Sequence, residues 1–356
     1  MIDYENILSK EPYSLNKNKK RTLFNKYLNA LTKYHYNNCY NYKKILDTIG
    51  YNIESNNPIE KIPFLPIRLF KEYELLSVKK SDVIKTMTSS GTSGQSLSKI
   101  FLDKKTSYNQ TKALSKIVTN IIGAKRLPIL IIDSENVIKD RKMFSARGAG
   151  ILGFSMFGKD RTFALSKNME LDLQKIEDFC NRHHDEKILV FGFTSLVWNY
   201  IYKGLMKIDK KISLAKGILI HGGGWKKLAD EKVDNKTFKK SLEKVTGLKK
   251  IFNYYGMIEQ TGSIFMECEK GNLHCSIFSD IIIRDQNFSI CNKNETGLVE
   301  LLSLLPYSYP GHIILSEDVG EILGEDDCPC GKLGKYFKIH GRIEKAEIRG
   351  CSDTHE

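Results

Sequence analysis

The sequence of 356 residues contains no uninterrupted apolar run that approaches the roughly 20 residues a helix needs to cross a bilayer. Its first residues do not follow the basic-then-apolar order of an export signal. The 8 cysteines are irregularly spaced, which argues against a disulfide framework and for reduced thiols or a metal site. These absences lead us to expect a cytoplasmic enzyme without a membrane span.

A basic stripe interleaved with aromatic residues is also lacking. Basic residues outnumber acidic ones by 55 to 42, for a net charge of +13, but the lysines are spread along the chain. Such a charge favours solubility and attracts anions without specifying a partner. We therefore interpret it as a solvated surface whose field attracts ATP and anionic substrates, and we expect no nucleic-acid partner.

The apolar pattern predicts an α/β fold. Apolar residues recur at helical spacing between Lys17 and Asp47 and the pattern closes near Gly50, which predicts an N-terminal helical lobe. Three continuous apolar runs, at 128–133, 187–191 and 216–221, are typical of strands buried on both faces of a mostly parallel sheet. Open α/β sheets bind ligands at strand ends, so the turns that follow these runs are candidate sites.

A loop rich in hydroxyls and glycines occupies residues 86–95. Its glycines let successive backbone N–H groups point into one concavity, and its hydroxyls add further donors. No Gly-Lys-Ser/Thr follows, so it is not a Walker loop. We expect it to bind phosphate through Ser89, Ser90, Gly91, Thr92, Ser93 and Gly94. The alternative is a flexible surface turn.

A second motif, Tyr-Gly-Met-Ile-Glu-Gln-Thr-Gly, spans residues 255–262 and follows a short apolar run that predicts a buried strand. Mg²⁺ typically takes one or two carboxylates together with phosphate oxygens. We therefore expect Glu259 to hold a magnesium ion that bridges nucleotide phosphates. Taken alone, this residue would be interpreted as a solvated loop acid.

The two motifs, in this order, resemble the phosphate loop and the Tyr-Gly-x-Thr-Glu motif of the adenylate-forming superfamily of acyl-CoA ligases. Segments at 62–71, 191–198, 221–226 and 341–353 are similar to the acyl-protein synthetase (LuxE-like) subunit of bacterial bioluminescence fatty-acid reductases. The resemblance implies ATP-dependent activation of a fatty or other hydrophobic carboxylic acid. It also implies three parts: a helical lobe over 1–57, an adenylation domain over 58–340, and a short C-terminal hinge and acyl-acceptor tail over 341–356.

The resemblance also implies the nucleotide contacts. The adenosine would lie near the glycines that follow His221, although a plain turn is the alternative, and we assign this histidine no catalytic role. Ile258 stands where most relatives carry threonine, so a phosphate hydrogen bond is expected to pass to Gln260 or Thr261. The implied nucleotide-binding residues beyond the phosphate loop are Gly222, Gly223, Gly224, Tyr255, Gly256, Gln260, Asp318 (to the ribose hydroxyls) and Arg342.

Soft metal ligands occur in two segments of the chain. Cys268 and the pair His274-Cys275 lie upstream of Cys328-Pro-Cys330. Cysteine and histidine close tetrahedral Zn²⁺ sites, and some relatives that resemble phenylacetate-CoA ligases pair such segments around structural zinc. We expect a zinc subsite within 268–330, with Cys275 as the substitute ligand, and two unconnected thiol pairs as the alternative. The predicted ligands are Cys268, His274, Cys328 and Cys330.

The sequence continues for fifteen residues after Gly341. Acyl-CoA ligases have there a domain that brings a lysine onto the acyl phosphate, so we expect that domain to be nearly absent. The resemblance instead implies that Cys351 receives the acyl group as a thioester and delivers it to an acyl reductase or acyltransferase. A thiolate is a strong enough nucleophile to attack an acyl adenylate. An unreactive cysteine in a frayed tail is the alternative.

Two other functions stay open. A free-standing acyl- or aryl-CoA ligase would depend on coenzyme A and tolerate loss of Cys351. A non-catalytic nucleotide- or acyl-binding scaffold would bind ATP without releasing pyrophosphate.

Overall fold

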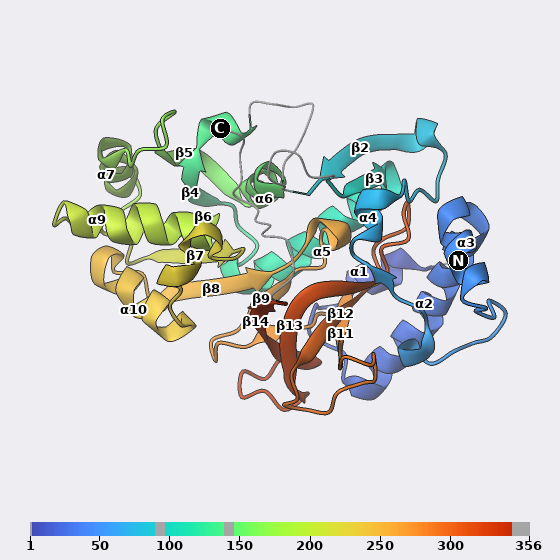
Figure 1. Cartoon of the computed structure of the whole chain (residues 1–356). Coiled ribbons are helices and arrows are strands. Elements are labelled where there is room, and N and C mark those ends of the chain that lie inside the picture. Colours follow the sequence, from blue (N-terminus) through green and yellow to red (C-terminus); the bar gives the residue numbers. More distant parts are fainter. Residues whose placement is uncertain (1, 90–96, 139–145, 344–356) are drawn as a thin grey trace. The chain divides into compact units, whose positions relative to one another are not determined.

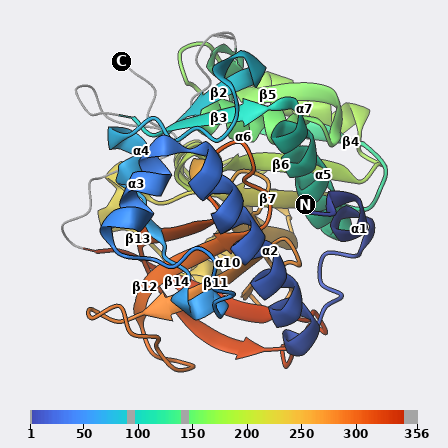
Figure 2. The ribbon, with the colours of Figure 1, turned by 90° about the vertical axis from the view of Figure 1, so that its right-hand side faces the viewer.

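The structure, a computed structural model, describes residues 2–89, 97–138 and 146–343 (Figures 1 and 2). These residues form two compact units. Unit 1 contains residues 2–88, 97–118 and 256–343, and unit 2 contains Ser89 with residues 119–138 and 146–255. Among the described residues, no helix combines the length and apolarity required to cross a bilayer.

Unit 2 is built on a parallel sheet. Its strands are β4 (Leu127–Ser134), β5 (Gly158–Leu165), β6 (Ile188–Phe193), β7 (Gly217–Gly222) and β8 (Lys250–Tyr255), in the order β5-β4-β6-β7-β8. Every residue of β4, β6 and β7 is buried. The three apolar runs therefore form interior parallel strands, and the predicted α/β class is confirmed.

Helices pack on this sheet through an apolar core that includes Phe179, Trp198, Phe238 and Leu242. A π-helical stretch, η4 (Val197–Lys203), connects two short α-helices in this layer. The helical elements are η3 (Glu135–Ile138), α6 (Ala146–Ser155), α7 (Leu173–Arg182), α8 (Thr194–Leu196), α9 (Gly204–Lys207), η5 (Lys226–Glu231) and α10 (Asn235–Thr246). Helix α5 (Lys104–Ile122) begins in unit 1 and ends in unit 2.

Unit 1 contains antiparallel strands that the apolar pattern did not predict. Their order is β11-β12-β13-β14-β10-β9, and β1 (Leu65–Pro66) pairs with β13 in parallel. The bounds are β9 (Phe265–Glu267), β10 (Leu273–His274), β11 (Ser279–Arg284), β12 (Gly297–Ser303), β13 (Ile313–Glu325) and β14 (Lys335–Arg342). A separate antiparallel pair is formed by β2 (Val83–Thr88) and β3 (Lys99–Asp103).

The N-terminal helical pattern forms two helices rather than one. After α1 (Tyr4–Ser9), helix α2 (Lys17–Asn38) ends at Cys39 and α3 (Tyr40–Thr48) begins there. Cys39 has an extended backbone, with φ −121 and ψ 107. It follows two asparagines, which are weak helix formers, so the break lies at the least helical point of the pattern. Short helices η1 (Ile59–Lys61), α4 (Leu69–Glu72), η2 (Lys80–Asp82) and η6 (Ile258–Gln260) complete this unit.

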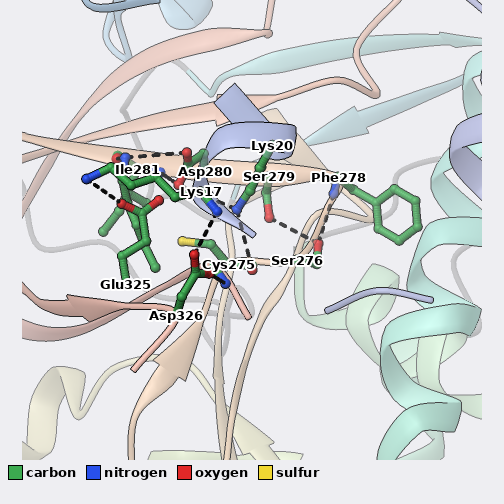
Figure 3. A network of polar contacts seen from close by, with 12 residues as sticks. Lys17, Lys20, Cys275, Ser276, Phe278, Ser279, Asp280, Ile281, Glu325 and Asp326 are labelled. Atoms are coloured by element: carbon green, nitrogen blue, oxygen red, sulfur yellow. Dashed lines mark hydrogen bonds and ion pairs between the residues drawn. The ribbon is translucent and has the colours of Figure 1, made fainter. Parts of the chain in front are cut away.

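Helix α2 is attached to the strands of unit 1 by a buried charge network (Figure 3). The Lys20 side chain is 2% exposed, and its Nζ lies 3.6 Å from Asp280 Oδ1 and 3.5 Å from the Cys275 carbonyl. Lys335 Nζ lies 3.4 Å from the other oxygen of Asp280. Burial opposes ionisation of Asp280, but the two lysines outweigh it and hold its pKa below the ordinary value. Residues 2–57 thus share a unit with the later strands, and the three-part division remains a prediction.

Candidate active-site elements and metal cluster

In unit 2, the candidate adenosine segment begins at the last residue of β7. A Cβ on Gly222 would lie 2.5 Å from the ring of Tyr254, and Gly223 has φ +80, a conformation that favours glycine. A Cβ on Gly224 would meet nothing within 4 Å. The first two glycines are thus required by the fold, whereas the third leaves open space. Contact with adenosine remains a prediction.

His221, immediately before these glycines, is 2% exposed. Its Nδ1 lies 3.0 Å from Thr194 Oγ1, and that hydroxyl donates to the Gly222 carbonyl at 3.1 Å. Burial, helped by the charge of Lys239, lowers the pKa of His221 to about 3. The imidazole is therefore neutral at ordinary pH. Thr194 lies within the segment 191–198 that carries part of the family resemblance, but no role was predicted for it.

In unit 1, Gly256 and the candidate magnesium carboxylate lie in the turn that follows the Tyr255 end of β8. A Cβ on Gly256 would approach Ile264 Cγ2 to 3.1 Å. Glu259 lies in η6 and is 2% exposed, so it is not a solvated loop acid. Its backbone carbonyl accepts a hydrogen bond of 2.9 Å from Tyr309 Oη. A buried carboxylate on a turn held in this way suits a cation, and its role with Mg²⁺ remains a prediction.

Gln260 is also 2% exposed, and its Nε2 donates to the carbonyls of Leu301 at 3.0 Å and Gly311 at 2.9 Å. An amide nitrogen has two hydrogens, so both of its donors are used on backbone. The Thr261 hydroxyl donates to the Ile258 carbonyl at 2.8 Å. A phosphate contact from either residue remains a prediction, and it would require these bonds to be exchanged.

The candidate ribose and nucleotide residues of unit 1 are brought together by strand register. Asp318 on β13 and Arg342 on β14 are direct partners, with Arg342 Nε 3.3 Å from Asp318 Oδ1. The Asp318 side chain is 14% exposed and that of Arg342 is 37% exposed. A ligand can therefore reach both, and the ion pair fixes their relative orientation.

Two predicted elements cannot be placed. The phosphate-loop residues Ser90 to Gly94 and the candidate acceptor Cys351 lie outside the described residues. Ser89, the first residue of the loop, directly follows β2 and is 9% exposed.

The four predicted metal ligands form one cluster in unit 1. Cys268 follows β9, His274 lies in β10, and Cys328 and Cys330 lie between β13 and β14. Strand β10 pairs with both β9 and β14, which brings the two segments together. The candidate ligand atoms all lie within 4.8 Å of one another. The alternative of two unconnected thiol pairs therefore does not hold, and Cys275, the predicted substitute, is not in the cluster.

The donor set suits zinc. Tetrahedral Zn²⁺ with Zn–S bonds of about 2.3 Å places its thiolate sulfurs about 3.8 Å apart, a spacing this cluster can adopt with small adjustments. Two ligands are already oriented by polar contacts: His274 Nε2 lies 3.3 Å from Cys330 Sγ, and Asn272 Nδ2 donates to Cys328 Sγ at 3.5 Å. His274 Nδ1 is buried without a hydrogen-bond partner among the described residues.

The fold is similar to that of solved structures of 2-hydroxyisobutyryl-CoA ligase. With the open conformation in complex with 2-HIB-AMP and CoA, the TM-score is 0.70 at 13% identity, over 95% of this chain and 78% of the ligase chain. With the postadenylation state in complex with 2-HIB-AMP, it is 0.70 at 13% identity, over 94% and 70%. This likeness shows the fold of an adenylate-forming ligase.

No curated protein sequence matches the chain. The family model described as "Acyl-protein synthetase, LuxE" matches residues 2–356. The chain therefore belongs to the LuxE acyl-protein synthetase family, as the resemblance of its motifs predicted.

Proposed function

We propose that the protein uses ATP to activate a fatty or other hydrophobic carboxylic acid as its acyl adenylate. The observation that carries this proposal is the family match over residues 2–356 on a fold that, in its ligase neighbours, holds an acyl adenylate. The substrate carboxylate attacks the α-phosphorus of ATP, a new C–O–P linkage forms, and the bond to pyrophosphate breaks. The product is a mixed anhydride with AMP as its leaving group.

The described residues support this step in distinct ways. The backbone of Gly222 to Gly224 provides a surface without side chains for the adenine. The Asp318 carboxylate accepts hydrogen bonds from the ribose hydroxyls, while its ion pair keeps Arg342 in place beside the nucleotide. These interactions bind and orient the ATP, and correct orientation is a large part of catalysis in such a transfer.

Glu259 would hold the magnesium ion that accompanies ATP. Its burial keeps the carboxylate away from bulk water, and the bond from Tyr309 to its backbone fixes the turn that carries it. Bound there, Mg²⁺ would neutralise charge on the phosphates as pyrophosphate leaves.

The second half-reaction is proposed from the family and from the chemistry of the tail. The Cys351 thiolate attacks the acyl carbon of the adenylate, a thioester forms, and AMP leaves. The acyl group can then pass to a partner acyl reductase or acyltransferase. A free-standing CoA ligase would instead use the thiol of coenzyme A for the same attack.

The Cys/His cluster is proposed as a structural zinc site. Four protein ligands complete a tetrahedral coordination sphere and leave no open position for substrate. The metal would join the β9–β10 hairpin to the connection between β13 and β14. Its binding free energy would then stabilise unit 1 rather than the transition state.

Pyrophosphate exchange with a panel of carboxylic acids tests the proposal. Exchange that depends on both ATP and a hydrophobic acid is expected, and Glu259→Gln serves as the inactive control. ATP binding without pyrophosphate exchange, whichever acid is added, would favour the non-catalytic scaffold. Exchange followed by product formation only with added coenzyme A, and unaffected by Cys351→Ser, would favour the CoA ligase.

A further inference from the structure

The glycine segment 222–224 is held at both ends by ring contacts within unit 2, from the buried His221 and the partly buried Trp225. At its start, His221 packs against Phe238 of α10, with ring centroids 4.5 Å apart and the ring planes tilted by 32°. At its end, Trp225 packs edge-on against Trp198 at 5.3 Å and against the same Phe238 at 6.0 Å. The three glycines therefore lie between two residues that are fixed by ring contacts, at the carboxyl end of β7 and near α10 (Figure 1).

The Thr194 hydroxyl, at the end of the neighbouring strand, contacts both His221 and the Gly222 carbonyl. Thr194 directly follows β6 and is 6% exposed. We propose that Thr194 and His221 are positioning residues that fix the Gly222 carbonyl, and with it the backbone on which the adenosine half of ATP binds. The inference rests on the proposed role of the glycine segment in nucleotide binding.

The number of available protons determines the hydrogen-bond directions between Thr194 and His221. The single Thr194 hydroxyl proton is donated to the Gly222 carbonyl at 3.1 Å, so toward His221 Nδ1, at 3.0 Å, the same oxygen must accept. His221 therefore carries its proton on Nδ1. His221 Nε2 is then a bare lone pair, and it has no hydrogen-bond partner among the described residues.

The reverse arrangement is less favourable. If Thr194 donated to His221 Nδ1, the Gly222 carbonyl would lose this donor and a buried Nε2–H would have no acceptor. Leaving buried polar groups unsatisfied costs more than the average hydrogen bond contributes. The burial that keeps the ring neutral also prevents the doubly protonated form. The Nδ1–H tautomer is thus a consequence of the local packing.

The bond to Gly222 acts at the last residue of β7, which pairs with Phe193 of β6 and Tyr254 of β8, and Gly223 and Gly224 follow directly after the strand. Gly223 has positive φ, and a Cβ there would come within 3.3 Å of Phe193 Cδ1, whereas a Cβ on Gly224 would meet no atom within 4 Å. Side-chain packing therefore constrains Gly224 least. Loss of the Thr194 hydroxyl would remove this bond from the Gly222 carbonyl and let Gly223 and Gly224, which follow the strand, sample other conformations. ATP would then have to order it, which weakens nucleotide binding without changing the reacting groups.

Three variants separate this role from general stability. Thr194→Val keeps the side-chain shape and removes the hydroxyl, and Thr194→Ser restores it. Thr246→Val is the matched control, because Thr246 is also fully buried in unit 2 and its hydroxyl donates to the Leu242 carbonyl at 2.6 Å, within α10. Acid-dependent pyrophosphate exchange and thermal unfolding are measured for each, and nitrogen-15 NMR reports the tautomer of His221.

Thr194→Val should raise the KM for ATP about tenfold with kcat nearly unchanged, as expected for the loss of one buried hydrogen bond from a binding surface. Thr194→Ser should recover most of the native KM, and Thr246→Val should lower the melting temperature without changing KM. A native KM in a folded Thr194→Val protein, or a kcat loss equal in Thr194→Val and Thr246→Val, would overturn the inference.

The tautomer of the native protein decides the matter even if Thr194→Val does not fold. An Nδ1–H signal supports the pair, and an Nε2–H signal refutes it. This readout needs no turnover. If native protein shows the Nδ1–H tautomer but no acid-dependent exchange, the proposed function fails and the hydrogen-bonded pair remains. If native protein exchanges pyrophosphate and Thr194→Val is unchanged, only the inference fails.

Discussion

Acid should destabilise unit 1 through two stacked, buried histidines. His35 on α2 and His312 lie with ring centroids 4.8 Å apart, and their side chains are 0% and 1% exposed. Burial lowers the pKa of His35 to about 3, against a smaller opposing effect of its hydrogen bond to Pro306. Burial and the neighbouring His35 hold the pKa of His312 well below its ordinary value. Both rings are therefore neutral in the folded protein.

The hydrogen bonds of His312 show why its protonation in the folded protein is unfavourable. The Thr32 hydroxyl donates to the Leu28 carbonyl at 2.8 Å, so it accepts from His312 Nε2 at 2.9 Å. His312 Nδ1 is then a lone pair without a partner among the described residues. A proton added to Nδ1 would be a buried charge with no counter-ion in its hydrogen bonds, next to another imidazole.

The expected magnitude follows from linkage. An unfolded histidine titrates near pH 6.5, and each unit of pH below that costs about 1.4 kcal/mol for a group that stays neutral when folded. The stability that each buried, neutral histidine contributes is fully present above pH 6.5, and it is lost as the pH falls toward the pKa of the folded state. At pH 5, about 1.5 units lower, the loss is about 2 kcal/mol for each histidine and about 4 kcal/mol for the pair.

Urea unfolding followed by circular dichroism at pH 7 and pH 5 measures this loss. His312→Gln keeps an amide donor for Thr32 but cannot titrate. Between pH 7 and pH 5, the free energy of unfolding of this variant should therefore fall by about 2 kcal/mol less than that of the native protein. His184→Gln, which removes an exposed imidazole, is the control and should fall as much as the native protein. If His312→Gln and native protein lose the same stability, the histidine pair does not carry the acid sensitivity.

Four further outcomes are expected. Gly91→Val should block backbone approach to phosphate and abolish acyl-adenylate formation in a folded protein, and unchanged pyrophosphate exchange would refute the loop assignment. Glu259→Gln should lower turnover by orders of magnitude with less effect on binding of the carboxylic-acid substrate, and a near-native rate would show that Glu259 does not bind the catalytic magnesium. Native protein should contain about one zinc per chain, and Cys328→Ser should lose both metal and stability, whereas metal-free native protein of full stability would argue against the site. Cys351→Ser should form acyl adenylate but retain no hydroxylamine-sensitive acyl label, and a label on another cysteine by mass spectrometry would exclude this thiol.

The parallel half of the fold could be predicted because its signal is local. Strands buried on both faces are continuous apolar runs, and β4, β6 and β7 are buried at every residue. The short antiparallel strands β9 and β10 could not be predicted in the same way, since they have three and two residues, too few for any alternation to show. The proximity of the four Cys/His side chains was nevertheless predicted, because soft ligands are rare enough to be recognised before the strand register that unites them is known.

The residues that hold the site were missed for a different reason. Thr194 and Tyr309 act through single hydroxyls on backbone carbonyls 28 and 50 positions away, and nothing in their own neighbourhood indicates the partner. Tyr309 is itself held by Gln110 of α5, whose Nε2 donates to its hydroxyl at 3.2 Å. Such contacts depend on the tertiary fold, whereas a carboxylate in a motif is visible in the sequence.

The motif around Glu259 combines a candidate metal-binding carboxylate with glycines that close packing requires. Gly262, the last residue of that motif, has a φ of +86, a conformation that favours glycine. A Cβ there would also lie 2.5 Å from the Gln110 carbonyl, and a Cβ on Gly311 would lie 2.8 Å from the Glu259 carbonyl. Both glycines thus admit backbone from elsewhere in unit 1 against the turn. The carboxylate is kept in position by close backbone contacts on either side, so substitution of either glycine should displace Glu259 even though neither residue can bind ATP or metal through a side chain.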